Sequence, residues 1–188
     1  ARLYMGMPHV VRSSAEKILC TNGTVPMACP APGVHAAGMA SPRLTLGRVS
    51  IPGQVYAVTT IASARRPLFR AAVNARIVID ALRESDRRRC TSTLAWVVMP
   101  DHLHWLFLLR QGTLADCMRG MKASAGKAIN RHNGAAGPVW QAGYHDHAIR
   151  TEESLHASAR YIVHNPVRAG LCQHPADYPH AWCRWPCP

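Results

Sequence analysis

The sequence predicts an α+β domain built on a ferredoxin-like antiparallel sheet, in the order β-α-β-β-α-β with the helices on one face, followed by a C-terminal helix. Two observations lead to this fold class. Short apolar runs with strand-like alternation are interleaved with longer stretches of helical periodicity. Hydrophobic residues make up 48% of the 188-residue chain, which is enough for one domain-sized core and excludes a wholly disordered chain.

Four segments open this order. The run 54–61 is β-branched and alternating, which predicts a strand. The stretch 65–88 that follows has apolar residues near helical spacing. The apolar run 93–99 and the segment 102–110 predict a hairpin, because only a Pro-Asp pair, too short for more than a tight turn, interrupts them.

The second half continues with a helix, a strand and a helix. The stretch 139–150 reads as a loop and then a strand. Thr151 is a good N-cap for the last helix, which must stop near Asn165 because Pro166 disfavours the helical conformation before it. The helix expected over 113–132 carries one apolar stripe, formed by Leu114, Met118, Met121, Ala125 and Ile129.

The chain divides by composition into an N-terminal extension over residues 1–42 and a folded domain over 43–188. Prolines, methionines and scattered apolar residues fill the first segment without any period. Such a segment cannot bury enough surface to offset its ordering entropy, so we expect it to be flexible. An upstream extension of a chain that naturally starts near Met39 and a true basic arm fit the sequence equally well.

The net charge of +12, from 22 Lys and Arg against 10 Asp and Glu, predicts a polyanionic partner, with nucleic acid the first candidate. An anionic membrane is the second candidate for this charge. No apolar run approaches the roughly 18–20 residues of a membrane span, which excludes an integral membrane protein, and the prediction is a nucleic-acid partner and no membrane. The seven cysteines are odd in number and include no C-x-x-C pair, which favours reduced thiols. With no evident export signal, the expected location is the cytoplasm.

The triplet His102-Leu103-His104 is the first candidate site. Alternate side chains of a strand point to one face, so both imidazoles emerge together while Leu103 points into the core. Two imidazoles so placed can share one divalent metal through a ring nitrogen each. The same spacing recurs at His145 and His147, and an isolated pair of this kind is more often two ordinary strand histidines.

Tyr161 is the second candidate. On the helix after Thr151 it belongs to a polar stripe, away from the apolar packing stripe, with the Asn165 amide one turn further on. A phenol beside a metal can attack a phosphodiester and form a covalent intermediate. Taken alone, Tyr161 is better explained as an amphipathic residue at the edge of the core.

Taken together, these features resemble a known family. The segments AWVVMPDHLHWLFLL, WQAGYHDHAIR and ARYIVHNPVRAGL are similar to the motifs of REP-associated tyrosine transposases, which are single-tyrosine HUH endonucleases. The resemblance covers roughly residues 43–182. It implies a metal held by His102 and His104 with Asn165 as a third ligand, and Tyr161 as the nucleophile.

The same resemblance implies the substrate and the reaction. Such enzymes cleave single-stranded DNA beside a hairpin, the repeated extragenic palindrome (REP), leaving a 5′-phosphate on the tyrosine and a free 3′-hydroxyl. We expect the protein to act as a monomer or homodimer. Eight basic side chains are the predicted phosphate contacts: Arg43, Arg48, Arg65, Arg66, Arg119, Lys122, Lys127 and Arg168.

Two other classes remain open on the sequence. A non-catalytic nucleic-acid-binding protein on a ferredoxin-like sheet should expose aromatic residues on that sheet, and Tyr56 is the obvious candidate. A hydrolytic metallonuclease should pair carboxylates. Five aspartates are available without paired spacing: Asp80, Asp86, Asp101, Asp116 and Asp146.

Overall fold

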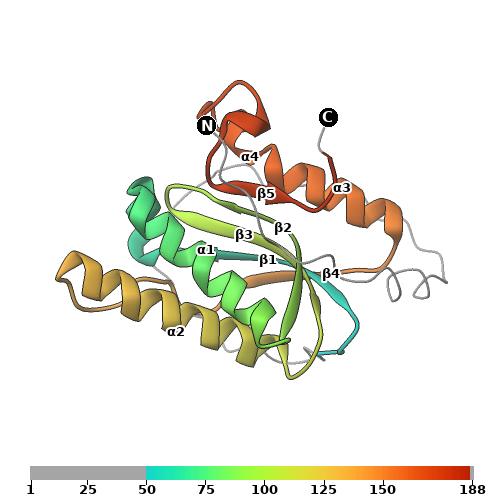
Figure 1. The fold of residues 1–188 in the computed structure, drawn as a ribbon, viewed down its shortest axis with the longest axis horizontal. Helices are drawn as coiled ribbons and strands as arrows, with labels where there is room; N and C mark the ends of the chain where they lie inside the picture. Colours follow the sequence, from blue (N-terminus) through green and yellow to red (C-terminus); the bar gives the residue numbers. More distant parts are fainter. Residues whose placement is uncertain (1–49, 187–188) are drawn as a thin grey trace. The chain divides into compact units, whose positions relative to one another are not determined.

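A five-stranded antiparallel sheet carries α1 and α2 on one face and α3 on the other (Figure 1). The computed structural model describes residues 50–186. Its strands lie in the order β4-β1-β3-β2-β5. The elements are β1 (Val55–Ile61), α1 (Ala72–Arg87), β2 (Thr91–Val98), β3 (His102–Leu109), α2 (Leu114–Asn133), β4 (His145–Ile149), α3 (Glu152–Val163), α4 (Asn165–Arg168) and β5 (Ala181–Cys183).

This order confirms the predicted fold class, because the first six long elements follow the ferredoxin-like sequence. The predicted extension over 1–42 lies outside the described residues, as do Arg43 and Arg48.

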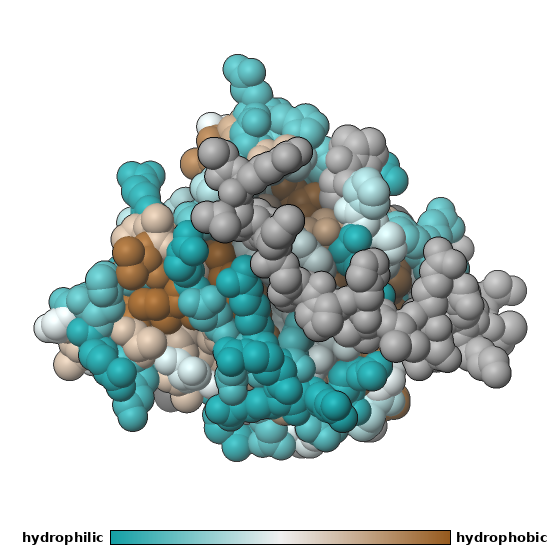
Figure 2. Space-filling model, viewed as in Figure 1, coloured by the Kyte–Doolittle hydropathy of each residue, from teal (hydrophilic) through white to brown (hydrophobic). Residues whose placement is uncertain are grey.

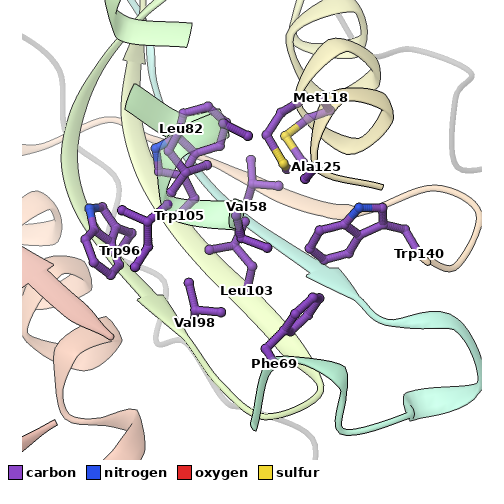
Figure 3. Packing of buried hydrophobic residues seen from close by; sticks show 14 of the residues in the cluster. Val58, Phe69, Leu82, Trp96, Val98, Leu103, Trp105, Met118, Ala125 and Trp140 are labelled. Atoms are coloured by element: carbon purple, nitrogen blue, oxygen red, sulfur yellow. The ribbon is translucent and has the colours of Figure 1, made fainter. Parts of the chain in front are cut away.

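The alternation of β3 explains how the sheet separates its two faces. Leu103, Trp105 and Phe107 are fully buried in the cluster shared with α1 and α2 (Figure 3). The rings of Trp105 and Phe107 stack with their centroids 4.0 Å apart. The intervening residues of β3 therefore point to the opposite face, where His102, His104 and Leu106 lie.

The α2 helix is placed by the apolar stripe that the sequence predicts. All five members of that stripe are buried. The hydroxyl of Thr113 accepts a hydrogen bond from the backbone of Asp116 and caps the N-terminus. Figure 3 shows Met118 and Ala125 of α2 above the sheet, with Trp140 beside them. In Figure 2 this side of the molecule shows hydrophilic residues across the lower middle of the view and a hydrophobic patch at its left.

The α3 helix covers the other face of the sheet. Ala159 and Ile162 pack with Leu106 of β3 and Val97 of β2. The N-cap is Thr151, as expected, since its hydroxyl accepts from the backbone of Ser154. The helix therefore lies on the face of β3 that also carries the two histidines.

The short strand β5 was not predicted from the sequence, because three residues are too few to show a periodic pattern. It is anchored to β2 by pairing Trp182 with Trp96. The Tyr178 hydroxyl donates to the carbonyl of Val98 at 2.9 Å and fixes the approach to this strand. Within residues 50–186, no helix combines the length and apolarity needed to cross a bilayer.

Candidate active site

The two histidines of the H-x-H motif point at each other from one face of β3. Their Nε2 atoms are 3.1 Å apart, and the rings are perpendicular. The strand is the central one of the sheet, with β1 and β2 on either side. The strand alternation thus produces the side-by-side geometry that the sequence predicts.

Each outer ring nitrogen has its own oxygen partner. His102 Nδ1 lies 2.6 Å from the Asp101 carboxylate, and His104 Nδ1 lies 2.7 Å from the Thr59 hydroxyl. Thr59 faces His104 directly in the β1–β3 register. When each Nδ1 carries the proton and donates to its oxygen, both Nε2 lone pairs remain available for a metal.

Burial keeps the His104 imidazole neutral. Desolvation first, and then the nearby His102 and Arg168, lower the pKa of His104 to about 3, against a smaller opposing effect of Asp101. A histidine with a pKa this low is unprotonated at neutral pH. Its Nε2 atom is therefore a ligand that requires no proton to be displaced.

The donor set fits a divalent cation. Two ligands about 2.1 Å from an octahedral ion and at right angles to each other lie roughly 3.0 Å apart, close to the observed separation of the two Nε2 atoms. Within residues 50–186, no group of three or more His, Cys, Asp or Glu side chains could form a metal site. A metal at this pair would therefore take its remaining ligands from amide oxygen, water or substrate.

The carboxylate that orients His102 is itself held by a cation. Arg65 Nη1 is 3.3 Å from Asp101 Oδ2, while Asp101 Oδ1 faces His102. The turn that presents Arg65 is strained, because Ala64 and Arg65 have φ of 54° and 51°, a region that side chains other than glycine rarely adopt. Strain of this kind persists where surrounding contacts dictate it.

We expect Asp101→Asn to weaken divalent-metal affinity by about 10–100-fold, because partners of this kind orient the ligand and raise its basicity. Titration of Mn²⁺, followed by electron paramagnetic resonance, measures the affinity without any need for turnover. Asp80→Asn is the matched control, since that carboxylate pairs with Arg83 on α1, on the other side of the sheet. Equal Mn²⁺ affinities of the two variants would show that Asp101 does not contribute to metal binding.

Tyr161 lies on the outward side of α3, where the Arg168 guanidinium covers its ring at 3.7 Å from the ring centroid. Arg168 also donates to the backbone carbonyl of Tyr161 at 3.0 Å. The charge of the same arginine also contributes to the lowered pKa of His104. The tyrosine is half-buried and outside the packing stripe, as the sequence predicts.

Asn165 closes the end of α3. Its amide nitrogen donates to the carbonyls of Tyr161 and Ile162, both at 3.1 Å. These bonds fix the amide and leave its oxygen as the atom with ligand chemistry. Its predicted role as third metal ligand stays a prediction.

The predicted phosphate contacts fall into two groups. Arg65 pairs with the Asp101 carboxylate beside His102 and Arg168 covers the Tyr161 ring, whereas Arg119, Lys122 and Lys127 lie on α2, on the other face of the sheet. Two members of the set, Lys122 and Arg66, donate to backbone carbonyls. Lys122 Nζ donates to Gln141 and Gly143, both at 2.7 Å, and Arg66 donates to Ser63 and Pro138. Arg119 pairs with Asp116.

The structure removes the features that favoured the two other classes. Tyr56 is only 4% exposed and lies in the core beneath α1 and α2, so the expectation of an exposed aromatic there was wrong. The reason is register, since Tyr56 pairs with the buried Phe107 on the same face. Asp86 is occupied by the hydroxyls of Thr91 and Thr93. The described residues contain no acidic metal cluster.

Two positioning residues were not found from the sequence. Asp101 stands directly before the motif, a position that could have suggested its role. Thr59 lies 45 residues away from His104 and becomes its partner only through the β1–β3 register.

The sheet, its histidine pair and the tyrosine-bearing helix define the class of HUH-type tyrosine transposases. The chain matches the profile of the family described as "Transposase IS200 like" over residues 51–165. This chain belongs to the IS200-like transposase family. The matched segment lies within residues 43–182, the range over which the sequence resembles REP-associated tyrosine transposases.

Two REP-associated tyrosine transposases are similar to this chain. The REP-associated tyrosine transposase of Escherichia coli (strain K12) is 31% identical over 87 residues, which cover 45% of this chain and 50% of the relative. The match thus spans about half the length of that protein. A solved REP-associated tyrosine transposase bound to a REP hairpin has a TM-score of 0.61 and 26% identity, covering 76% of this chain and 82% of that one.

Proposed function

We propose that this protein is a single-stranded DNA endonuclease and strand transferase that acts on REP-type hairpins through a 5′-phosphotyrosine at Tyr161. The observation that carries the proposal is the pair of Nε2 atoms 3.1 Å apart, each with an oxygen partner behind its ring. The family supports the reaction class, and the hairpin-bound relative supports the substrate.

Each residue has a defined task in the cleavage step. The Tyr161 oxygen attacks the scissile phosphorus and forms a P–O bond, while the bond to the 3′-oxygen breaks. The phenol loses one proton and the departing 3′-oxygen gains one, so the step consumes no cofactor. A 3′-hydroxyl that attacks the phosphotyrosine reverses the same chemistry and joins a new strand.

His102 and His104, with the Asn165 oxygen as third ligand, would hold Mg²⁺ or Mn²⁺. The ion supplies Lewis-acid polarisation of the scissile phosphate. Arg168 covers the Tyr161 ring and its charge lowers the pKa of His104, so it would add positive charge for the scissile phosphate. Arg65 holds the Asp101 carboxylate and also remains 65% exposed, so it can contact a nearby phosphate.

Cleavage of a labelled REP-type hairpin with a single-stranded tail tests this function. We expect a covalent protein–DNA adduct in Mg²⁺ or Mn²⁺, none after chelation, and none with a perfect duplex of the same sequence. Hairpin binding should persist without metal, because phosphate contacts and not the ion supply most of the affinity. Adduct formation after exhaustive chelation, or equal reaction of duplex and hairpin, would contradict the proposal.

A further inference from the structure

The outward side of α3 bears an open groove that continues away from Tyr161. Its volume is about 780 Å³. One wall is a row of basic and imidazole side chains spaced four residues apart, His156, Arg160, His164 and Arg168. The site described above uses only the last of these. The other three have no assigned role.

The adjacent row of the same helix, which contains Tyr161, also lines the groove. Glu153, Ala157 and Tyr161 form this row, again four residues apart. Ala157 leaves space between the rows because its side chain is a single methyl group. Glu153 lies in the first turn of α3, where a carboxylate stabilises the positive end of the helix.

One side chain of the basic row is available to bind a ligand. Arg160 is exposed, and in the described part of the chain its side chain makes no hydrogen bond or ion pair. The Nε2 atom of His164 is buried without a hydrogen-bond partner among residues 50–186. At the far end, Trp185 contacts His156 with ring centroids 4.8 Å apart.

The spacing of the row suits a single strand. Four residues of helix rise about 6 Å, which is close to the distance between successive phosphates of an extended strand. Arginine and imidazole side chains at such intervals can contact one phosphate each, and an aromatic side chain beside them can stack a base.

We propose that this groove binds the DNA segment on the 3′ side of the cleaved phosphate. The inference rests on the proposed function, because attack by Tyr161 leaves the 5′-phosphate, and hence the downstream strand, attached to the tyrosine. That strand must leave the protein across the surface next to Tyr161. The groove lined by Arg160 and His164 is that surface, and it would retain the strand until a 3′-hydroxyl attacks.

Binding measured in the Tyr161→Phe background tests this without cleavage. The probes are two labelled REP-type hairpins, one ending at the mapped cleavage position and one extended by several nucleotides beyond it. Arg160→Ala should weaken binding of the extended probe by about tenfold, the effect of one charged hydrogen bond, and leave the short probe unchanged. The salt dependence of the extended probe should fall by about one unit.

Arg83→Ala is the matched control, since this exposed arginine lies on α1, on the other side of the sheet. It should bind both probes like the parent. Equal losses for both probes with Arg160→Ala, or no loss, would overturn the inference while leaving adduct formation, and with it the proposed function, intact.

A second measurement uses no mapped site. A short oligo(dT) that carries 4-thiothymidine is irradiated with the Tyr161→Phe chain, and the cross-linked peptides are sequenced. We expect cross-links within residues 153–168 or at Trp185. Cross-links confined to α2 would overturn the assignment of the groove.

Discussion

Replacing Tyr161 by phenylalanine should abolish the covalent adduct and lower hairpin cleavage by at least about 10⁴-fold, because the variant removes the oxygen that the proposed mechanism assigns to the covalent intermediate. Binding of the hairpin should change little. The ring itself remains, so its contact with the Arg168 guanidinium is kept. A gel of labelled oligonucleotide and an anisotropy titration measure the two effects on the same preparation.

Tyr178→Phe is the matched control. This tyrosine is also half-buried, but its hydroxyl donates to the Val98 carbonyl beneath β5. Its loss should cost about 1 kcal/mol of stability and leave cleavage unchanged. Cleavage by the Tyr161 variant at a rate near that of the parent would identify water or another side chain as the nucleophile.

Replacing His102 by alanine should reduce cleavage by about 10²–10³-fold and abolish measurable Mn²⁺ binding, because a metal loses one of two imidazole ligands and the transition state loses its Lewis acid. His102 is preferable to His104 for this test, since the buried His104 ring also bonds to Thr59. Mn²⁺ titration separates loss of metal from loss of fold, and circular dichroism reports the latter.

The second H-x-H pair supplies a control within the same chain. His147 lies on the edge strand β4, exposed, two residues after His145. His147→Ala should leave both metal binding and cleavage as in the parent. Equal losses in the His102 and His147 variants would show that the spacing alone does not identify the metal site.

The fold could be predicted because its elements carry strong local signals. The apolar stripe of α2 and the alternation of β3 both lie in continuous sequence, so local periodicity was sufficient. The three-residue β5 has no such signal and depends on its pairing with β2. The burial of Tyr56 was likewise decided by its position opposite Phe107, a contact between distant segments.

The site could be predicted only in part. Strand geometry alone brings His102 and His104 together, and helical spacing alone places Tyr161 off the packing face. Thr59 behind His104 and Arg65 on Asp101 arise from long-range pairing and from a strained turn. The net charge predicted a nucleic-acid partner, but it could not show which basic side chains already bind groups within the protein. Lys122 is one of these, since its Nζ donates to two backbone carbonyls.

The most direct measurement is mass spectrometry of the adduct formed with a hairpin labelled at either end. Cleavage by trypsin after Arg160 and Arg168 releases the peptide 161–168, which contains one tyrosine. The account predicts that this peptide carries a 5′-phosphate-linked nucleotide on Tyr161, and that only the 3′-labelled strand remains on the protein. An unmodified peptide 161–168 together with cleaved DNA, or retention of the 5′-labelled strand, would contradict it.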